Sequence, residues 1–151
     1  MPKIAIIYYS RTGNTEKMAQ AILEGAQKLP EVEGRLLIDF EATSATLEDV
    51  DAIIVGTPTY HHDIPRSIKH FFESMATQAT NLTQKIGASF GSFGWSGEAP
   101  RLVLEIMEHK FAMNVIKPPL LSKYQPDNVA LTKCHEFGKK IAEQLMESKD
   151  T

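Results

Sequence analysis

Residues 4–15 read IAIIYYSRTGNT and join a short apolar run to a loop of small polar residues. The run, residues 4–9, is rich in β-branched and aromatic side chains without polar alternation, which is typical of a strand covered on both faces. After the loop, apolar residues recur at four- and three-residue steps: Met18, Ile22, Ala26 and Leu29. This period predicts an amphipathic helix, so the stretch predicts a strand, a tight polar loop and a helix in that order.

The alternation of strand-like and helix-like segments continues along the chain. Four further strands are predicted: a peripheral one over residues 35–39, continuous apolar ones over 52–55 and 86–90, and a last one over 113–117 that Pro118 and Pro119 stop. Helical periodicity returns over residues 64–75, 102–107 and 130–145. This order predicts an α/β fold in which helices cover both faces of a parallel sheet. We expect one domain over residues 1–151, frayed only at residues 148–151.

Composition limits the classes of function. The 151 residues are 42% hydrophobic and 23% charged, which excludes wholesale disorder. Lys and Arg number 16 against 19 Asp and Glu, a net charge of -3 that disfavours a basic face for nucleic acid. The N-terminal apolar run is too short for a signal peptide or a membrane span, so we expect a cytoplasmic protein. The single cysteine, Cys134, lies on a helical apolar stripe, which predicts an inert, packed thiol.

In a parallel α/β sheet, ligands bind at the carboxyl ends of the strands, where the first loop, residues 10–15, lies. Gly13 permits a backbone conformation that other residues avoid, and the helix N-terminus that follows favours an anion. A simple helix cap would not explain all four of the hydroxyl and amide side chains in this loop. The loop lacks the Gly-Lys-Ser/Thr of a Walker motif and the Gly-x-Gly-x-x-Gly of a dinucleotide fold. We interpret it as a site for a phosphate monoester.

Two further loops place aromatic residues at the same edge. Residues 56–63, GTPTYHHD, contain a stiffening Pro58 and the flat ring of Tyr60. Residues 91–97, GSFGWSG, surround Trp95 with glycines. A buried core tryptophan is the more common case, but the glycine-rich setting favours an indole that stacks on a ligand. A phosphate at one end and two aromatic residues at the other fit a mononucleotide with a planar, apolar ring, and flavin mononucleotide (FMN) fits best.

These motifs resemble the flavodoxin family. Residues 9–15 match its phosphate loop, and residues 91–95 look like the second isoalloxazine loop of its short-chain, clostridial-type members. Residues 90–97 and 123–127 are most similar to the flavodoxin domain of flavodiiron (A-type) flavoproteins, but 151 residues leave no room for a diiron domain, so we expect a free-standing module. The resemblance implies a three-layer fold with a five-stranded parallel sheet of order 2-1-3-4-5. It also implies non-covalent FMN that cycles between oxidised, semiquinone and hydroquinone states.

The resemblance also implies which residues hold FMN. Residues 10–15 would hold the phosphate, Trp95 would stack on the outer ring face and Tyr60 would cover the inner face. Backbone groups of residues 59–62 and 92–95 would reach the pyrimidine and N5 edges. The complete predicted set is Ser10, Arg11, Thr12, Gly13, Asn14, Thr15, Pro58, Thr59, Tyr60, His61, His62, Ser92, Phe93, Gly94, Trp95 and Gly97. We predict no catalytic residue and no metal ligand.

Two histidines depart from the clostridial pattern. His61 stands where those relatives have a glycine whose peptide flips toward the protonated N5, and a flip is harder without glycine. His61 and His62 have two open interpretations: exposed loop side chains, or cations that stabilise the reduced flavin. As cations they would raise the potential of the second reduction step.

The leading hypothesis for function is a low-potential carrier that moves electrons between redox partner proteins, such as iron-sulfur or flavin oxidoreductases, as a monomer or weak dimer. One alternative is an FMN-dependent NAD(P)H:quinone oxidoreductase, because residues 56–59 also resemble the corresponding loop of those enzymes. A flavin-dependent sensor or scaffold is a third class. The predicted cofactor rim holds Arg11, Arg66, Arg101, His61 and His62 against Asp63 and Glu98. Flavodoxins generally have an acidic rim, so we expect weak salt dependence of docking and a less negative potential here.

Overall fold

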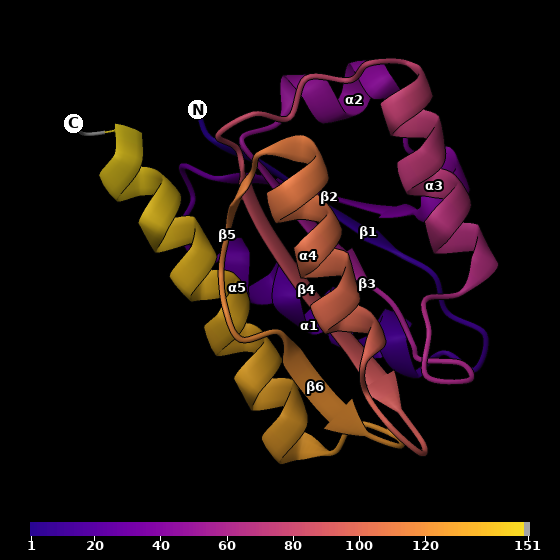
Figure 1. The fold of residues 1–151 in the computed structure, drawn as a ribbon. Helices are drawn as coiled ribbons and strands as arrows, with labels where there is room; N and C mark the ends of the chain where they lie inside the picture. Colours follow the sequence, from indigo (N-terminus) through magenta and orange to yellow (C-terminus); the bar gives the residue numbers. More distant parts are fainter. Residues whose placement is uncertain (150–151) are drawn as a thin grey trace.

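A sheet of parallel strands forms the centre of the molecule (Figure 1). The structure is a computed structural model that describes residues 1–149. The strands are β1 (Lys3–Tyr8), β2 (Glu33–Ile38), β3 (Ala52–Gly56), β4 (Ile86–Phe93), β5 (Asn114–Val115) and β6 (Leu120–Lys123). Their order is β2-β1-β3-β4-β5, and β6 pairs with β4. In the register of the sheet, Ile6 of β1 lies between Leu36 of β2 and Ile54 of β3. The predicted order 2-1-3-4-5 is confirmed.

The end of the sheet differs from the prediction of five strands. The predicted last strand, residues 113–117, is reduced to β5, and the chain returns after the two prolines as β6. The β5 strand pairs with residues 86–87 of β4, and β6 pairs with residues 90–93. Proline cannot donate to a strand ladder, so Pro118 and Pro119 interrupt this edge strand rather than end it. Because β6 supplies a partner, β4 continues through Gly91–Phe93, which the sequence predicted as loop.

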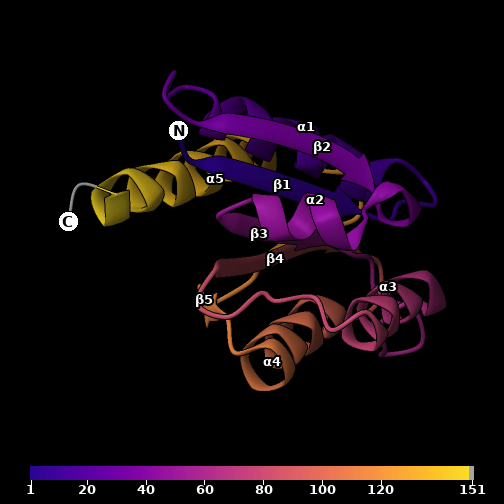
Figure 2. The same ribbon diagram turned by 90° about the horizontal axis from the view of Figure 1, so that it is seen from above.

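The helices cover the two faces of the sheet, as Figure 2 shows. The helices are α1 (Asn14–Ala26), α2 (Ser44–Asp49), α3 (Arg66–Thr77), α4 (Ala99–Phe111) and α5 (Asn128–Lys149), with a short 3-10 helix, η1 (Asp39–Glu41). Helices α1 and α5 lie on one face, and α3 and α4 lie on the other. The short α2 and η1 were not predicted. The expected fraying is wrong for residues 148–149, which belong to α5, and residues 150–151 lie outside the described chain.

The alternation of side chains along each strand explains why the core has two parts, one on each face of the sheet. Ile4 and Ile6 of β1 pack with Met18 and Cys134 on the α1–α5 side, and Ile7 packs on the α3–α4 side. Successive side chains of a strand point to opposite faces, so one apolar run supplies both cores. Cys134 is fully buried, and burial raises the pKa of its thiol to about 12. The prediction of a packed cysteine is confirmed, and its lack of reactivity stays a prediction.

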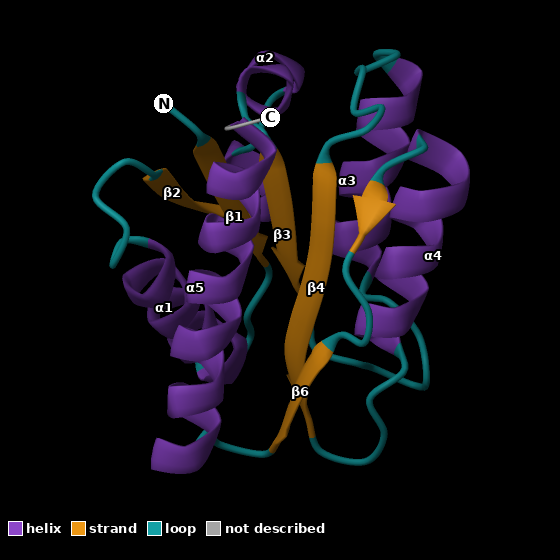
Figure 3. Ribbon diagram, turned by 90° about the vertical axis from the view of Figure 1, so that its left-hand side faces the viewer, coloured by secondary structure: helices purple, strands orange, loops and turns teal. Residues whose placement is uncertain are grey.

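The carboxyl ends of β1, β3 and β4 lie at one end of the sheet, opposite the chain termini (Figure 3). The predicted loops therefore leave the sheet at the same edge. Among the helices of residues 1–149, none is long and apolar enough to cross a membrane.

Candidate functional site

The first loop, between β1 and α1, is held by its own backbone geometry. Gly13 is the N-cap of α1 with φ of 91°, and its N–H donates to Ser10 Oγ at 3.0 Å. No side chain of the described chain caps this helix, so the loop is not a simple side-chain cap. The first-turn N–H groups and the exposed Arg11 and Thr12 thus lie where an anion would be stabilised. This arrangement fits the phosphate of FMN.

Thr15 points inward rather than toward solvent. Its side chain is 1% exposed, and its Oγ1 lies 3.2 Å from Ser92 Oγ and accepts from Ser92 N at 3.4 Å. Ser92 belongs to β4, so this contact ties the first loop to the strand that carries the third loop. A phosphate contact by Thr15 stays a prediction, but its role in joining two loops is visible in the structure.

The second loop, residues 57–63, starts against β4. Thr57 N donates to Phe90 O at 2.9 Å, and Thr57 Oγ1 donates to the carbonyl of the buried Pro58. A Cβ atom at Gly91 would lie 1.9 Å from Thr57 O, so this close approach requires glycine. Farther along, Thr59 Oγ1 accepts from Ala99 N at 2.9 Å, where α4 begins.

A tight turn at the two histidines ends the second loop. Tyr60 and Asp63 exchange both backbone hydrogen bonds, at 3.1 and 3.0 Å. The residues between them, His61 and His62, have φ of 53° and 63°, in the left-handed region. That region costs a residue with a side chain about 1–2 kcal/mol. The chain therefore keeps a strained turn here without glycine, and a peptide flip at His61 stays a prediction.

The two aromatic residues of the predicted ring site are placed differently. Trp95 is 87% exposed, so a core position is wrong for it, while stacking on the flavin stays a prediction. Tyr60 is half-buried and packs edge-to-face on Tyr9, with ring centroids 6.4 Å apart. Burial raises the pKa of Tyr60, Tyr9 adds to this, and the Arg11 guanidinium acts in the opposite direction. These contacts connect the second loop to the first.

A polar cluster joins the second loop to the third. His62 Nδ1 lies 2.7 Å from Glu98 Oε2 and 3.0 Å from Ser96 Oγ, and Ser96 Oγ donates to the same carboxylate oxygen at 3.2 Å. The hydrogen bond from Ser96 is the main cause that lowers the pKa of Glu98; partial burial opposes it, and His62 adds to the lowering. Serine and glutamate share one ring nitrogen, so this is no nucleophile–base relay, in which they would use opposite nitrogens. The hydrogen bonds connect the second loop to the residues that follow Trp95.

The predicted cofactor set leaves out Ser96, Glu98 and Tyr124, although Glu98 was expected at the rim. The sequence separation of 36 between His62 and Glu98 hides their contact, and only the short spacing of Ser96 and Glu98 behind Trp95 could have suggested it. Tyr124, 61% exposed, donates its N–H to Phe93 O at 2.7 Å. Its ring lies beside Gly94, next to the predicted ring site.

Charges at the rim are more paired than the sequence indicates. Lys69 pairs with Asp63 at 2.5 Å, and Arg101 pairs with Glu105 at 2.9 Å. The count from sequence omitted Lys69 and Glu105. Among residues 1–149, no group of three or more His, Cys, Asp or Glu side chains is arranged to hold a metal ion.

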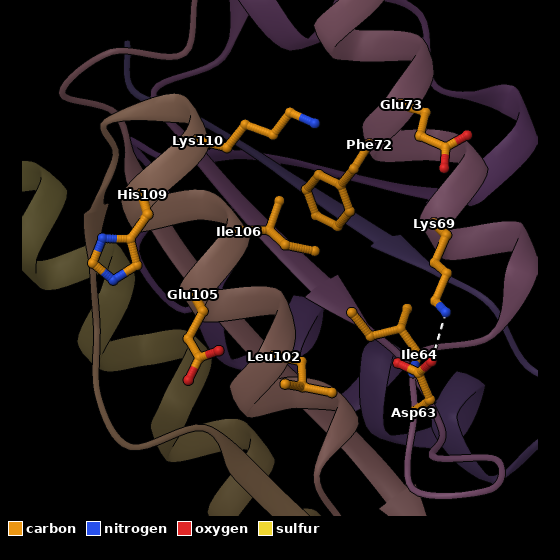
Figure 4. A pocket seen from close by; sticks show the side chains of 10 residues that line it. All are labelled: Asp63, Ile64, Lys69, Phe72, Glu73, Leu102, Glu105, Ile106, His109 and Lys110. Carbon is orange, nitrogen blue, oxygen red and sulfur yellow. Dashed lines mark hydrogen bonds and ion pairs between the residues drawn. The ribbon is translucent and has the colours of Figure 1, made fainter.

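A groove of about 710 Å³ lies between α3 and α4. Figure 4 shows Phe72 of α3 facing Ile106 of α4 across it, with the Lys69–Asp63 pair at one end. None of its lining residues belongs to the predicted cofactor set. The groove is therefore a separate feature, which begins where the second loop ends.

Comparison with known proteins places these features in context. The family model described as Flavodoxin matches residues 6–138. A type A flavoprotein, fprA of Rhodobacter capsulatus, is 37% identical over 147 residues, which are 94% of this chain and 33% of that protein. A flavodoxin of Aquifex aeolicus is 37% identical over 99 residues, 64% of this chain and 54% of that protein. The chain thus spans about a third of the length of the first of these relatives.

Solved structures agree with the fold. A flavodoxin from the domain Archaea superposes with a TM-score of 0.89 and 34% identity, over 95% of this chain and 99% of that one. The flavodiiron protein of Giardia intestinalis matches with a TM-score of 0.86 over 96% of this chain and 36% of that one. Its identity of 20% supports the fold alone.

Proposed function

Because the chain belongs to the flavodoxin family, whose cofactor is FMN, we propose that it carries electrons between redox partner proteins on a non-covalently bound FMN. One observation carries this proposal: loops that follow three different strands are joined at one edge. The first loop supplies the N-terminus of α1, which no described side chain caps, and the third loop supplies the exposed indole of Trp95. FMN supplies one- and two-electron chemistry when it is bound, and the protein supplies binding, orientation and electrostatics.

Each part of this edge would have a separate task. The first-turn N–H groups of α1, with Ser10, Arg11 and Thr12, would hold the phosphate. Tyr60 and Trp95 would lie on the two faces of the ring. Backbone groups of the second and third loops (the ring loops) would contact its edge. Neither ring loop offers an acid–base pair aimed at a substrate, since Glu98 and Ser96 are engaged with His62. This supports a carrier over an enzyme.

The proposal extends to the setting of the protein. We propose that residues 1–151 act as one domain, in the cytoplasm, as a monomer or weak dimer. Its partners would be redox proteins such as iron-sulfur or flavin oxidoreductases. Docking would bring the partner's redox centre to the rim where Trp95 lies.

Anaerobic reduction with spectroscopy tests this function. The purified protein, loaded with FMN, is photoreduced stepwise and then mixed with a one-electron acceptor; we expect complete and rapid reoxidation. The same protein is given NADPH or NADH with a benzoquinone, and we expect no turnover above that of free FMN. Sustained pyridine-nucleotide oxidation would instead establish a quinone reductase, and failure to take up FMN would overturn both assignments.

A further inference from the structure

The His62 cluster gives the second loop a side-chain connection to the third loop. His62 contributes one ring nitrogen, Nδ1, to both Ser96 and Glu98, at 3.0 and 2.7 Å. It stands in the turn whose two central residues both have positive φ. Residues in that conformation persist when surrounding contacts over-determine them, and such positions gather at ligand sites. The hydrogen bonds of His62 with Ser96 and Glu98 connect this strained turn to the end of the third loop.

The donors and acceptors of the cluster are fixed by chemistry. An ionised carboxylate only accepts hydrogen bonds, so Glu98 Oε2 accepts one from His62 Nδ1–H and one from Ser96 Oγ–H. Nδ1 therefore carries the hydrogen that His62 donates to Glu98. Protonation of Glu98 would remove the negative charge that strengthens both hydrogen bonds.

We propose that His62, Ser96 and Glu98 are positioning residues that clamp the two ring loops together and so set how tightly FMN is held and at what potential it is reduced. The inference rests on the proposed FMN site and adds residues outside the predicted set, Ser96 and Glu98. The clamp acts on the cofactor through the loops: Glu98 precedes α4, and His62 follows Tyr60 by two residues. Loosening it frees the turn beside the ring.

Two ion pairs lie in the segments next to the cluster. On the second loop and α3, Asp63 pairs with Lys69; on α4, Arg101 pairs with Glu105. The other ionisable side chains near the cluster in sequence are Tyr60 and His61 of the second loop and Arg66 at the start of α3. Experiments on the clamp therefore need variants that leave these pairs intact.

The chain provides a matched control for an exposed histidine–glutamate pair. His135 Nε2 lies 2.9 Å from Glu24 Oε2, between α5 and α1, on the opposite face of the sheet from α3 and α4. Exposed ion pairs usually contribute little to stability. If the His62 pair were only such a pair, its removal would have no more effect on FMN than removal of the His135 pair.

The test measures the FMN dissociation constant of the reconstituted full chain by quenching of FMN fluorescence. The variants are His62→Asn, which keeps a residue that tolerates positive φ, Ser96→Ala, Glu98→Ala and the double variant His62→Asn/Glu98→Ala. The controls are His135→Asn and Glu24→Ala. Far-ultraviolet circular dichroism and the thermal midpoint of each apoprotein identify any variant that fails to fold, and Glu98→Gln replaces Glu98→Ala in that case.

We expect FMN affinity to fall about three- to tenfold in His62→Asn and Glu98→Ala and by a smaller factor in Ser96→Ala. The double variant should bind no more weakly than the weaker single, because both break one connection. The reduction potential of the bound FMN should shift in the same variants. The FMN dissociation constants of both controls should stay within about twofold of wild type. Losses that match the controls, or losses that add in the double variant, would overturn the clamp. Absence of FMN binding by wild type would instead overturn the proposed function.

Discussion

The phosphate loop and the ring loops belong to one proposed site, yet they are built in different ways. The phosphate loop is a continuous stretch whose geometry comes from Gly13 and the helix that starts beside it. The ring loops depend on residues far apart in the chain, such as His62 and Glu98, and on the fit of Gly91 against Thr57. One region is local and fixed by backbone; the other is assembled by folding.

This difference suggests separate tasks. A loop with rigid backbone donors suits the phosphate, whose charge and shape do not change during electron transfer. Loops joined by side chains can adjust to a ring that changes charge and protonation. The comparison therefore predicts that variants in the first loop act on the phosphate alone, and variants in the ring loops act on the ring.

Gly13→Val should give the largest effect. Its φ of 91° is unfavourable for valine, although a Cβ would meet no atom within 4 Å, so the cost is in the backbone. We expect the free loop of this variant to relax from that conformation. Restoring it on binding costs about 2 kcal/mol, the upper end for a β-branched residue, which corresponds to roughly 30-fold weaker FMN binding. Fluorescence titration should show riboflavin, which lacks the phosphate, within about twofold of wild type. Gln20→Val, exposed on the same helix, is the control; equal losses for both flavins would erase the distinction between the regions.

Trp95→Ala should have the next largest effect. Stacking of a flat base on an aromatic side chain is worth about 1–3 kcal/mol, so we expect about tenfold weaker binding of FMN and riboflavin alike. The free energy of unfolding of the apoprotein should change by less than about 0.5 kcal/mol, because the ring is 87% exposed. Phe40→Ala, at an 80% exposed ring, serves as the control. A loss confined to FMN would contradict a ring contact.

Acid should weaken the ring loops through Glu98, and riboflavin reports this without the phosphate of FMN, whose second pKa is about 6. The pKa of Glu98 in the folded protein lies below its ordinary value of 4.5. Its carboxylate is therefore fully effective above pH 4.5, and its contribution is lost as the pH falls through the lower, folded-state value. We expect riboflavin affinity to fall by about threefold through that range in wild type, on the scale of an exposed ion pair. The Glu98→Ala variant should bind riboflavin weakly and with the same affinity at both ends of this pH range. If its affinity falls with pH as much as that of wild type, groups other than Glu98 cause the fall.

Salt should have the smallest effect. Lys69 and Arg101 of the rim each have an ionic partner, which leaves Arg11 and Arg66 against Glu98 among the rim charges and no large field of one sign. We expect the rate of electron transfer to a charged one-electron acceptor to change by less than about twofold between 20 and 500 mM salt. Stopped-flow mixing of the photoreduced protein checks this, and a change of tenfold or more would indicate a strongly charged rim.

The same contrast explains what the sequence could predict. Continuous apolar runs and helical periods are local, so most strands, the main helices and the loop between β1 and α1 followed from them. The strand order followed from the family resemblance. The sixth strand followed from neither, because the pairing of residues 120–123 with β4 depends on the edge that folding leaves open. The clamp of His62 with Glu98 escaped for the same reason. Its residues meet only after α3 and β4 have brought two loops to one edge.

The ratio of riboflavin to FMN dissociation constants in the wild-type apoprotein tests most directly that one edge holds both phosphate and ring. Both flavins are titrated against the same protein at neutral pH, with lumiflavin as a ring-only reference. We expect FMN to bind at least about 30-fold more tightly than riboflavin, on the scale of charge-assisted hydrogen bonds from the first loop. Riboflavin should still quench on binding. Equal dissociation constants for FMN and riboflavin would contradict a phosphate site at the first loop and, with it, this account of the cofactor edge.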